Sequence, residues 1–396
     1  MIKIVFTSKE KVTDTLIFDI KYTIIMAIYE KKVELIELFY DLIFVYAISK
    51  LTALISEPVS GTIPLSSFFV YLITSFVILQ AWLYFTNYVN RYGQWKWFDY
   101  ALAIVNMIAV IYMANTITTH WDGMLVPFNI SMLVMLLTVV CLYSIQDRKQ
   151  ENKNNAARNS IQILSIVCTI YVIALVAILL NLSSYVIWID VVAVITGAFL
   201  PFFLKGNFDK SIINFPHLVE RFELLTIITF GEAVVGMTHF FDVTSFNPMP
   251  ILVFIIVLSM FGAYVIQIHN LMNHHRVERS LRLMFSHYFV IISINLMTVA
   301  FELLHSGEVN PILESCLIIV SLVIFYTSIM ANRPYYKDEV KFLKSDAIKM
   351  ILLTLIGALI ILIFMENVYL FLAGVLVITL ANFSILAAIQ KKYLKD

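Results

Sequence analysis

Four charged side chains interrupt an apolar run near the start of the chain. The run covers residues 33–55 and contains Glu34, Glu37, Asp41 and Lys50. It is long enough to cross a bilayer, which takes about 20 mostly apolar residues. An acid at the centre of a membrane helix costs roughly 2.5–3.5 kcal/mol on insertion scales, so these acids need partners, water or a function. The run therefore predicts a helix that lines a polar site in a polytopic membrane protein.

The acids of this run share one face of the expected helix. Glu34, Glu37 and Asp41 stand at positions i, i+3 and i+7, a spacing that places them on the same side. If the chain enters the bilayer near residue 33, Glu37 lies about 6 Å and Asp41 about 12 Å along the helix. Pairing with cytoplasmic arginines explains the two glutamates as well as a functional role does. The greater depth of Asp41 favours a functional role.

A second stretch, residues 221–240, also combines acids with an apolar background. Glu223 is the shallow acid, and Glu232 follows Gly231 near the middle of the expected span. Small residues let another helix backbone approach closely. A buried acid at this position could carry a proton, and a structural hydrogen bond to a neighbouring helix is the alternative. We therefore expect Asp41 and Glu232 to bind a coupling cation, with Glu37, Glu223 and Glu302 as further members of an ion or substrate site.

Several charged groups are expected near the cytoplasmic ends of the helices. We predict that they form a gate or a structural clamp, and separate salt bridges at the helix ends are a slightly favoured alternative. The predicted network comprises Glu37, Glu223, Arg91, Asp99 and His287.

Composition sets the class of the protein. Of the 396 residues, 61% are hydrophobic and 14% are charged, against about 25% charged in a typical soluble domain. The formal net charge is zero, which argues against nucleic acid as a partner. The three cysteines lack metal-ligand spacing, and nucleotide-binding or hydrolase motifs are absent from the sequence. We therefore expect an integral membrane protein with the lipid bilayer as its partner and with no metal or cofactor. An enzyme is the less favoured class.

The hydropathy pattern predicts about twelve transmembrane helices and an all-α fold. Residues 1–32 contain six lysines and are expected to form a cytoplasmic or interfacial segment. The predicted spans are 33–55, 66–89, 98–117, 124–144, 161–181, 184–204, 221–240, 249–270, 284–304, 311–331, 347–365 and 367–389.

The placement of basic residues predicts the orientation. If the twelve helices alternate, 26 of the 27 lysines and arginines lie on or just inside one face, and the exception is Lys50. Cytoplasmic loops carry the excess of basic residues. We therefore expect a multi-pass protein of the cell membrane with both termini in the cytoplasm.

The chain also shows a possible internal duplication. V-E-L-I-E-L at residues 33–38 matches V-E-R-F-E-L at 219–224 with an offset of 186 residues. Six helices per half give both halves the same orientation, as in parallel-repeat transporters. We expect a first six-helix repeat at 33–204, a cytoplasmic linker at 205–220, and a second six-helix repeat with a short cytoplasmic tail at 221–396.

The residues E-L-F-Y-D-L-I-F-V-Y-A-I at 37–48 resemble the signature of the bacterial low temperature requirement A protein (LtrA) family. Further similarities are Asn90–Arg91, Gly231–Glu232, and the pair His287 and Glu302, whereas Gln267–His269 depart from the aromatic residues expected there. The resemblance implies a multi-pass bacterial plasma-membrane protein linked to growth at low temperature.

Three functional hypotheses follow. The leading one is a cation-coupled secondary transporter of a small solute. The second is a cation channel, because Phe39–Tyr40–Asp41 on a first helix is similar to the Phe-Ser-Asp helix of the two-repeat endolysosomal potassium channels, with Tyr40 in place of the small serine. The third is a membrane enzyme acting on lipid or envelope precursors, for which His287 and Asp99 would have to lie within reach of each other.

Overall fold

The computed structural model describes residues 31–117, 121–149, 155–203, 213–240, 247–275 and 280–394. Within these ranges the chain forms twelve α-helices, two 3-10 turns and one π-helical turn. The helices are α2 Leu35–Ser56, α3 Leu65–Tyr92, α4 Trp97–Thr116, α5 Trp121–Lys149, α6 Asn155–Leu179, α7 Ser183–Phe203, α8 Phe215–Met237, α9 Met249–Tyr264, α10 Leu281–Ser306, α11 Pro311–Met330, α12 Lys344–Ile363 and α13 Val368–Tyr393. The short turns are η2 Thr238–Phe240, η3 Val265–Asn270 and η4 Arg333–Tyr335.

This arrangement confirms the predicted all-α membrane fold. Eleven helices are long and apolar enough to cross a membrane. The twelfth, α8, has 23 residues and is about 34 Å long at 1.5 Å per residue, so it also reaches across a bilayer. Its charged residues, among them Glu220, Arg221 and Glu223, distinguish it from the other eleven.

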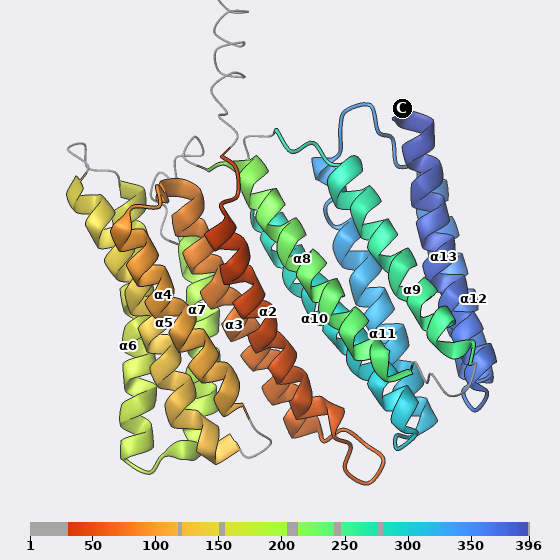
Figure 1. Cartoon of the computed structure of the whole chain (residues 1–396), viewed down its shortest axis with the longest axis horizontal. Helices are drawn as coiled ribbons and strands as arrows, with labels where there is room; N and C mark the ends of the chain where they lie inside the picture. The colour runs from red at the N-terminus through yellow and green to blue at the C-terminus, as the bar shows by residue number, and fades with distance from the viewer. Residues whose placement is uncertain are drawn as a thin grey trace, which may run out of the picture.

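The helices run across the bundle in alternating directions (Figure 1). We call the side that carries Lys31 and Tyr393 the terminal side, and the other the distal side. Every lysine and arginine that the structure describes, apart from Lys50, lies in a terminal-side loop or within about two turns of one. The described residues thus agree with the charge segregation expected from the sequence, while the lysines of residues 1–30 lie outside them.

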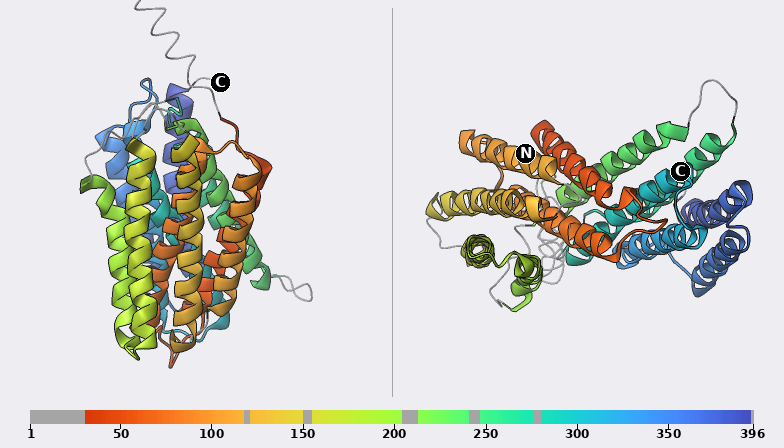
Figure 2. Two further views of the ribbon diagram at one scale, coloured as in Figure 1. Left: turned by 90° about the vertical axis from the view of Figure 1, so that its left-hand side faces the viewer. Right: turned by 90° about the horizontal axis from the view of Figure 1, so that it is seen from below.

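The two halves of the chain lie side by side (Figures 1 and 2), and several of their helix contacts correspond. In the first half α2 packs against α3 and α4, α4 against α5, and α6 against α7. In the second half α8 packs against α9 and α10, α10 against α11, and α12 against α13. Other contacts differ, since α5 packs closely against α6 whereas α11 touches α12 only slightly, and α9 packs more extensively against α13 than α3 does against α7. The halves meet where α2 and, to a smaller extent, α3 contact α8 and α10. This contact brings the two acid-bearing helices of the sequence together.

Helix α8 begins at Phe215, about six residues before the predicted start, for a local reason. The Asn214 side chain accepts a hydrogen bond from the backbone N–H of His217 at 3.1 Å, and Pro216 occupies the first turn. Asparagine is a favoured N-cap, and proline is compatible with the first turn because its missing N–H would have no helical partner. The earlier start adds His217 to the helix and places Arg221 two turns inside it.

Candidate functional site at the contact of α2 and α8

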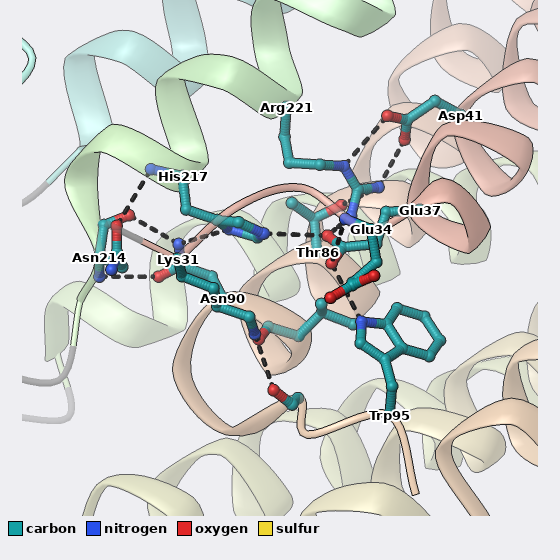
Figure 3. A network of polar contacts seen from close by, with 12 residues as sticks. Lys31, Glu34, Glu37, Asp41, Thr86, Asn90, Trp95, Asn214, His217 and Arg221 are labelled. Carbon is teal, nitrogen blue, oxygen red and sulfur yellow. Dashed lines mark hydrogen bonds and ion pairs between the residues drawn. The ribbon is translucent and has the colours of Figure 1, made fainter. Parts of the chain in front are cut away.

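A buried guanidinium joins the two halves of the molecule. Arg221 of α8 lies between Glu37 and Asp41 of α2, and the side chains of all three are fully buried (Figure 3). Its Nη1 donates to Glu37 Oε2 at 2.6 Å, while Nε and Nη2 donate to the two oxygens of Asp41 at 3.0 and 2.5 Å. One arginine therefore bridges two carboxylates that stand one helical turn apart, and its contact with Asp41 is bidentate.

Two tryptophans complete the hydrogen bonding of the carboxylates. The indole N–H of Trp82 on α3 donates to Asp41 Oδ1 at 2.7 Å, and that of Trp95 donates to Glu37 Oε1 at 3.1 Å. Arg221 also lies over the ring of Trp82, 5.6 Å from its centroid. A buried charge is tolerated where its hydrogen-bonding capacity is filled, as it is here.

His217 extends this cluster toward the terminal side. The orientation of Asn90 is fixed because its Nδ2 donates to the Asn214 carbonyl at 2.7 Å and its Oδ1 accepts from the Asn214 N–H at 3.2 Å. The same Nδ2 faces His217 Nδ1 at 3.1 Å, so Nδ1 accepts and a neutral ring carries its proton on Nε2. Nε2 lies 3.0 Å from Glu37 Oε2. The histidine ring thus lies against the carboxylate that also binds Arg221.

Lys31 covers the terminal edge of the cluster. Its ammonium donates to the backbone carbonyls of Val89 and Gly93 at the end of α3, the latter at 2.8 Å. Burial lowers the pKa of Lys31 below its ordinary value, and the neighbouring Glu37 opposes that shift. We refer to Glu37, Asp41, Arg221, His217 and their direct partners as the Arg221 cluster.

A second set of polar contacts continues along α2 toward the distal side. Ser49 donates to Glu232 of α8 at 2.5 Å, and Ser56 donates to Glu302 of α10 at 3.1 Å. At 100° per residue, Asp41, Ser49 and Ser56 lie within about 80° on one side of α2. We call the Ser49–Glu232 and Ser56–Glu302 contacts the distal pair.

Close helix approach positions the distal pair. A Cβ added to Gly236 of α8 would lie 2.9 Å from Thr298 Cγ2 and 3.4 Å from Glu302 Oε1. Only a residue without a side chain lets α8 come this near to α10. Gly236 therefore serves helix packing next to Glu302, whereas a Cβ on Gly231, the glycine noted in the sequence, would have nothing within 4 Å.

The two predicted cation ligands, Asp41 and Glu232, lie on the same α2–α8 contact but in separate groups. Asp41 is paired with Arg221, while Glu232 contacts Ser49. The eight residues from Asp41 to Ser49 correspond to about 12 Å along α2. In the part of the chain that the structure describes, no lysine, arginine or histidine pairs with Glu232.

The residues of the predicted terminal-side network occupy different contacts. Glu37 belongs to the Arg221 cluster, whereas Glu223 pairs with His269 at 3.1 Å. Asp99 accepts from Tyr88 at 2.8 Å and from its own helix N-terminus at 2.9 Å. His287 lies 3.0 Å from the Tyr264 hydroxyl and 2.8 Å from the Leu283 carbonyl. Arg91 lines a cavity beside α3.

Sequence reasoning missed the basic half of the main site. The expected span begins at residue 221, so Arg221 is its first residue and His217 falls in the expected linker at 205–220. Trp82 and Trp95 had no distinguishing pattern. The available signal was the pair of buried acids itself, because two intramembrane carboxylates require a cation and Arg221 was the basic residue nearest to the matching helix.

The family comparison covers most of the chain. The model of the bacterial low temperature requirement A protein (LtrA) family matches residues 32–387. This range includes both acid-bearing helices and the whole Arg221 cluster except Lys31. No match was found among curated proteins or among solved structures. The chain belongs to the LtrA family of bacterial membrane proteins.

Proposed function

We propose that this LtrA protein is a secondary transporter of the bacterial plasma membrane that couples a small solute to a monovalent cation. The observation that carries the proposal is the fully buried Arg221 bridge between α2 and α8. A buried ion pair is a weak stabiliser, because desolvation offsets most of its attraction. In a transporter a buried ion pair can instead distinguish two conformations, since the same charges can be paired and dehydrated in one and hydrated in the other.

In this proposal the Arg221 cluster is the gate on the cytoplasmic side. The six-helix repeats at 33–204 and 221–396 rock about the α2–α8 contact, as parallel repeats do in other transporters. The terminal side faces the cytoplasm, because it carries the described basic residues. The helix contacts that correspond in the two halves support this plan.

In this scheme the coupling cation has two binding sites along the α2–α8 contact. With the gate closed, the guanidinium of Arg221 occupies the position of a cation between Glu37 and Asp41. When the halves separate, the coupling cation takes that position. Glu232 is the distal binding site, because it is an acid in a helix contact that accepts a hydrogen bond from the neutral hydroxyl of Ser49. Glu302 lies next to it, on the far side of Gly236.

The remaining predicted residues have supporting roles in this scheme. Glu223 anchors α8 to His269 of η3, and His287 anchors α10 to Tyr264 of α9. Asp99 holds Tyr88 of α3 against the start of α4. These contacts keep each half rigid while the contact between the halves opens.

Equilibrium binding of radioactive sodium to the purified chain tests the proposal without knowledge of the solute. We expect saturable binding that protons compete for, and a loss of at least tenfold in affinity for Glu232→Gln. Glu339→Gln, an exposed acid on the terminal side, is the matched control. Unchanged sodium and proton binding in both Asp41→Asn and Glu232→Gln would overturn the assigned roles.

Two further measurements separate the alternatives. Single-channel currents in a planar bilayer, driven by a cation gradient alone, would identify a channel instead. An altered lipid or envelope profile on gene deletion, with no cation binding, would identify a membrane enzyme. We also expect deletion to slow growth in the cold, as the family description implies.

A further inference from the structure

A cavity of about 150 Å³ lies on the other side of α3 from the Arg221 cluster. It is enclosed by α3, α5, α6, α7 and α10, so both halves of the chain contribute to it. Two different faces of α3 contribute to the Arg221 cluster and to the cavity. Trp82, Thr86 and Asn90 face the Arg221 cluster, and the residues that line the cavity stand at i, i+4, i+7 and i+11, namely Gln80, Tyr84, Asn87 and Arg91.

Most of the cavity wall is apolar. Leu83 of α3, Ile163 and Leu164 of α6, Pro201 of α7 and Phe285 of α10 form much of its surface. A cavity of about 150 Å³ is the size that accepts a benzene ring in a protein core. A largely apolar wall around a space of this size favours the hydrocarbon body of a small ligand.

Most of the polar lining residues belong to α3, and the others are Tyr143 of α5, Ser160 of α6 and Tyr288 of α10. The amide of Asn87 and the hydroxyl of Tyr288 make no hydrogen bond within the described part of the chain, and the buried hydroxyl of Tyr84 has no partner there either. Arg91 adds a positive charge on the same face of α3, one turn from Asn87. Buried polar groups are normally satisfied, so donors without partners in an apolar cavity indicate a ligand that accepts hydrogen bonds.

The backbone of α7 is shaped to let Tyr84 into this wall. A Cβ on Gly197 would lie 2.0 Å from the Tyr84 hydroxyl and 2.8 Å from Gln80 Nε2. Gln80 in turn donates to the Val194 carbonyl at 3.1 Å. The glycine therefore allows α3 and α7 to bring polar side chains to an otherwise apolar space.

We propose that this cavity binds a small organic monoanion with an apolar body, such as an aromatic or branched aliphatic carboxylate. The carboxylate accepts hydrogen bonds from Asn87 and Arg91, and the body packs among Leu83, Ile163 and Phe285. The assignment of the cavity as a binding site for such an acid does not depend on the proposed function. The further assignment of this acid as the transported solute rests on the proposed function, because Arg91 directly follows Asn90 of the gate in α3.

Titration calorimetry on the full chain in nanodiscs of neutral phospholipid tests the site. The probes are benzoate and isovalerate. Benzamide is the control compound that lacks the charge, and acetate is the control compound that lacks the apolar body. We expect benzoate and isovalerate to bind at least tenfold more tightly than benzamide and acetate. Equal binding of benzoate and benzamide would overturn recognition of the charge.

Two variants locate the binding. Arg91→Gln should weaken benzoate at least tenfold, whereas Arg148→Gln, an exposed arginine on the same side of the bundle, should leave it unchanged. Ala198→Phe fills the cavity without changing its charge and should abolish binding, with folding checked by its thermal unfolding profile. Normal benzoate affinity in Arg91→Gln and Ala198→Phe would place the ligand elsewhere.

Failure of this proposal can be told from failure of the transporter proposal. Sodium binding that depends on Glu232 with no binding of any acid would overturn the solute class alone. Acid binding without sodium binding would overturn the coupling alone. A phospholipid that copurifies in stoichiometric amount with the native chain, but not with Ala198→Phe, would show that a lipid is the occupant and overturn the small-acid assignment.

Discussion

The two ends of the α2–α8 contact solve the problem of a buried acid in different ways. At the terminal end, Glu37 and Asp41 are compensated by Arg221 and by two indole donors. At the distal end, Glu232 contacts a serine hydroxyl. The first arrangement provides a guanidinium as the partner of its carboxylates, and two indole N–H groups fill their remaining hydrogen-bonding capacity. The second pairs its acid with a neutral hydroxyl and, in the part of the chain that the structure describes, with no basic side chain.

In the transporter that we propose, this difference gives the acids at the two ends of the α2–α8 contact separate roles. The bidentate bridge is a geometrically defined contact that opens as a unit, which suits the proposed gate. An ion site needs a weaker contact that a cation can replace. Both lie on the same side of α2, so motion of α8 along α2 affects them together. The following substitutions test this contrast, in order of decreasing effect.

Arg221→Met should have the largest effect. It leaves the buried carboxylates of Glu37 and Asp41 without their cation, which typically costs about 3–5 kcal/mol. We expect a large fall in the thermal unfolding temperature in detergent. The combination with Glu37→Gln and Asp41→Asn should recover much of that loss, since it removes the stranded charges. A triple variant no more stable than Arg221→Met would show that the charges are not the cause.

Trp82→Phe should have an intermediate effect at the same end. It deletes the indole donor to Asp41 while keeping an aromatic ring, and a hydrogen bond to a charged group contributes about 1.5–3 kcal/mol. Trp97→Phe is the matched control, because Trp97 is 81% exposed and should change stability little. Equal unfolding temperatures for the two variants would argue that the Trp82–Asp41 bond adds nothing.

Glu232→Gln should affect stability by less than about 1 kcal/mol, because the amide oxygen can still accept from Ser49. Its effect should appear in cation binding instead. Arg221→Met and Glu232→Gln should therefore differ in kind, since the Arg221 cluster is expected to govern stability and Glu232 is expected to govern ion affinity. A loss of stability as large as that of Arg221→Met would place Glu232 in the structural frame.

Much of the fold could be predicted from the sequence, for physical reasons. A span needs about 20 apolar residues whatever its neighbours, so hydropathy locates it. The asymmetric placement of basic residues then checks the count. Errors arose at helix starts such as Phe215, which depend on the Asn214 cap and Pro216 rather than on hydropathy.

Only the acidic residues of the site could be predicted from the sequence. Acids stand out in an apolar run, so Glu37, Asp41 and Glu232 were recognisable. Their partners were not, because the 180 residues between Asp41 and Arg221 leave no local pattern that pairs them. Trp82 and Trp95 act through single N–H groups, and hydropathy does not separate such tryptophans from lipid-facing ones. Which helix faces meet is a property of the packed bundle.

Lys31→Met should give the smallest effect and tests where the Arg221 cluster meets water. Burial lowers the pKa of Lys31, so between its folded pKa and the unfolded value of about 10.4 the unfolded chain binds more protons. The contribution of Lys31 to the free energy of unfolding therefore rises as the pH rises from the pKa of Lys31 in the folded chain to its value in the unfolded chain. The contribution falls again as the pH drops through the pKa of the folded chain. The difference in unfolding temperature between the native chain and Lys31→Met, followed from pH 7 to about pH 10.4, should shift in favour of the native chain as pH rises. A difference that is independent of pH would mean that Lys31 remains hydrated and that water reaches the edge of the cluster.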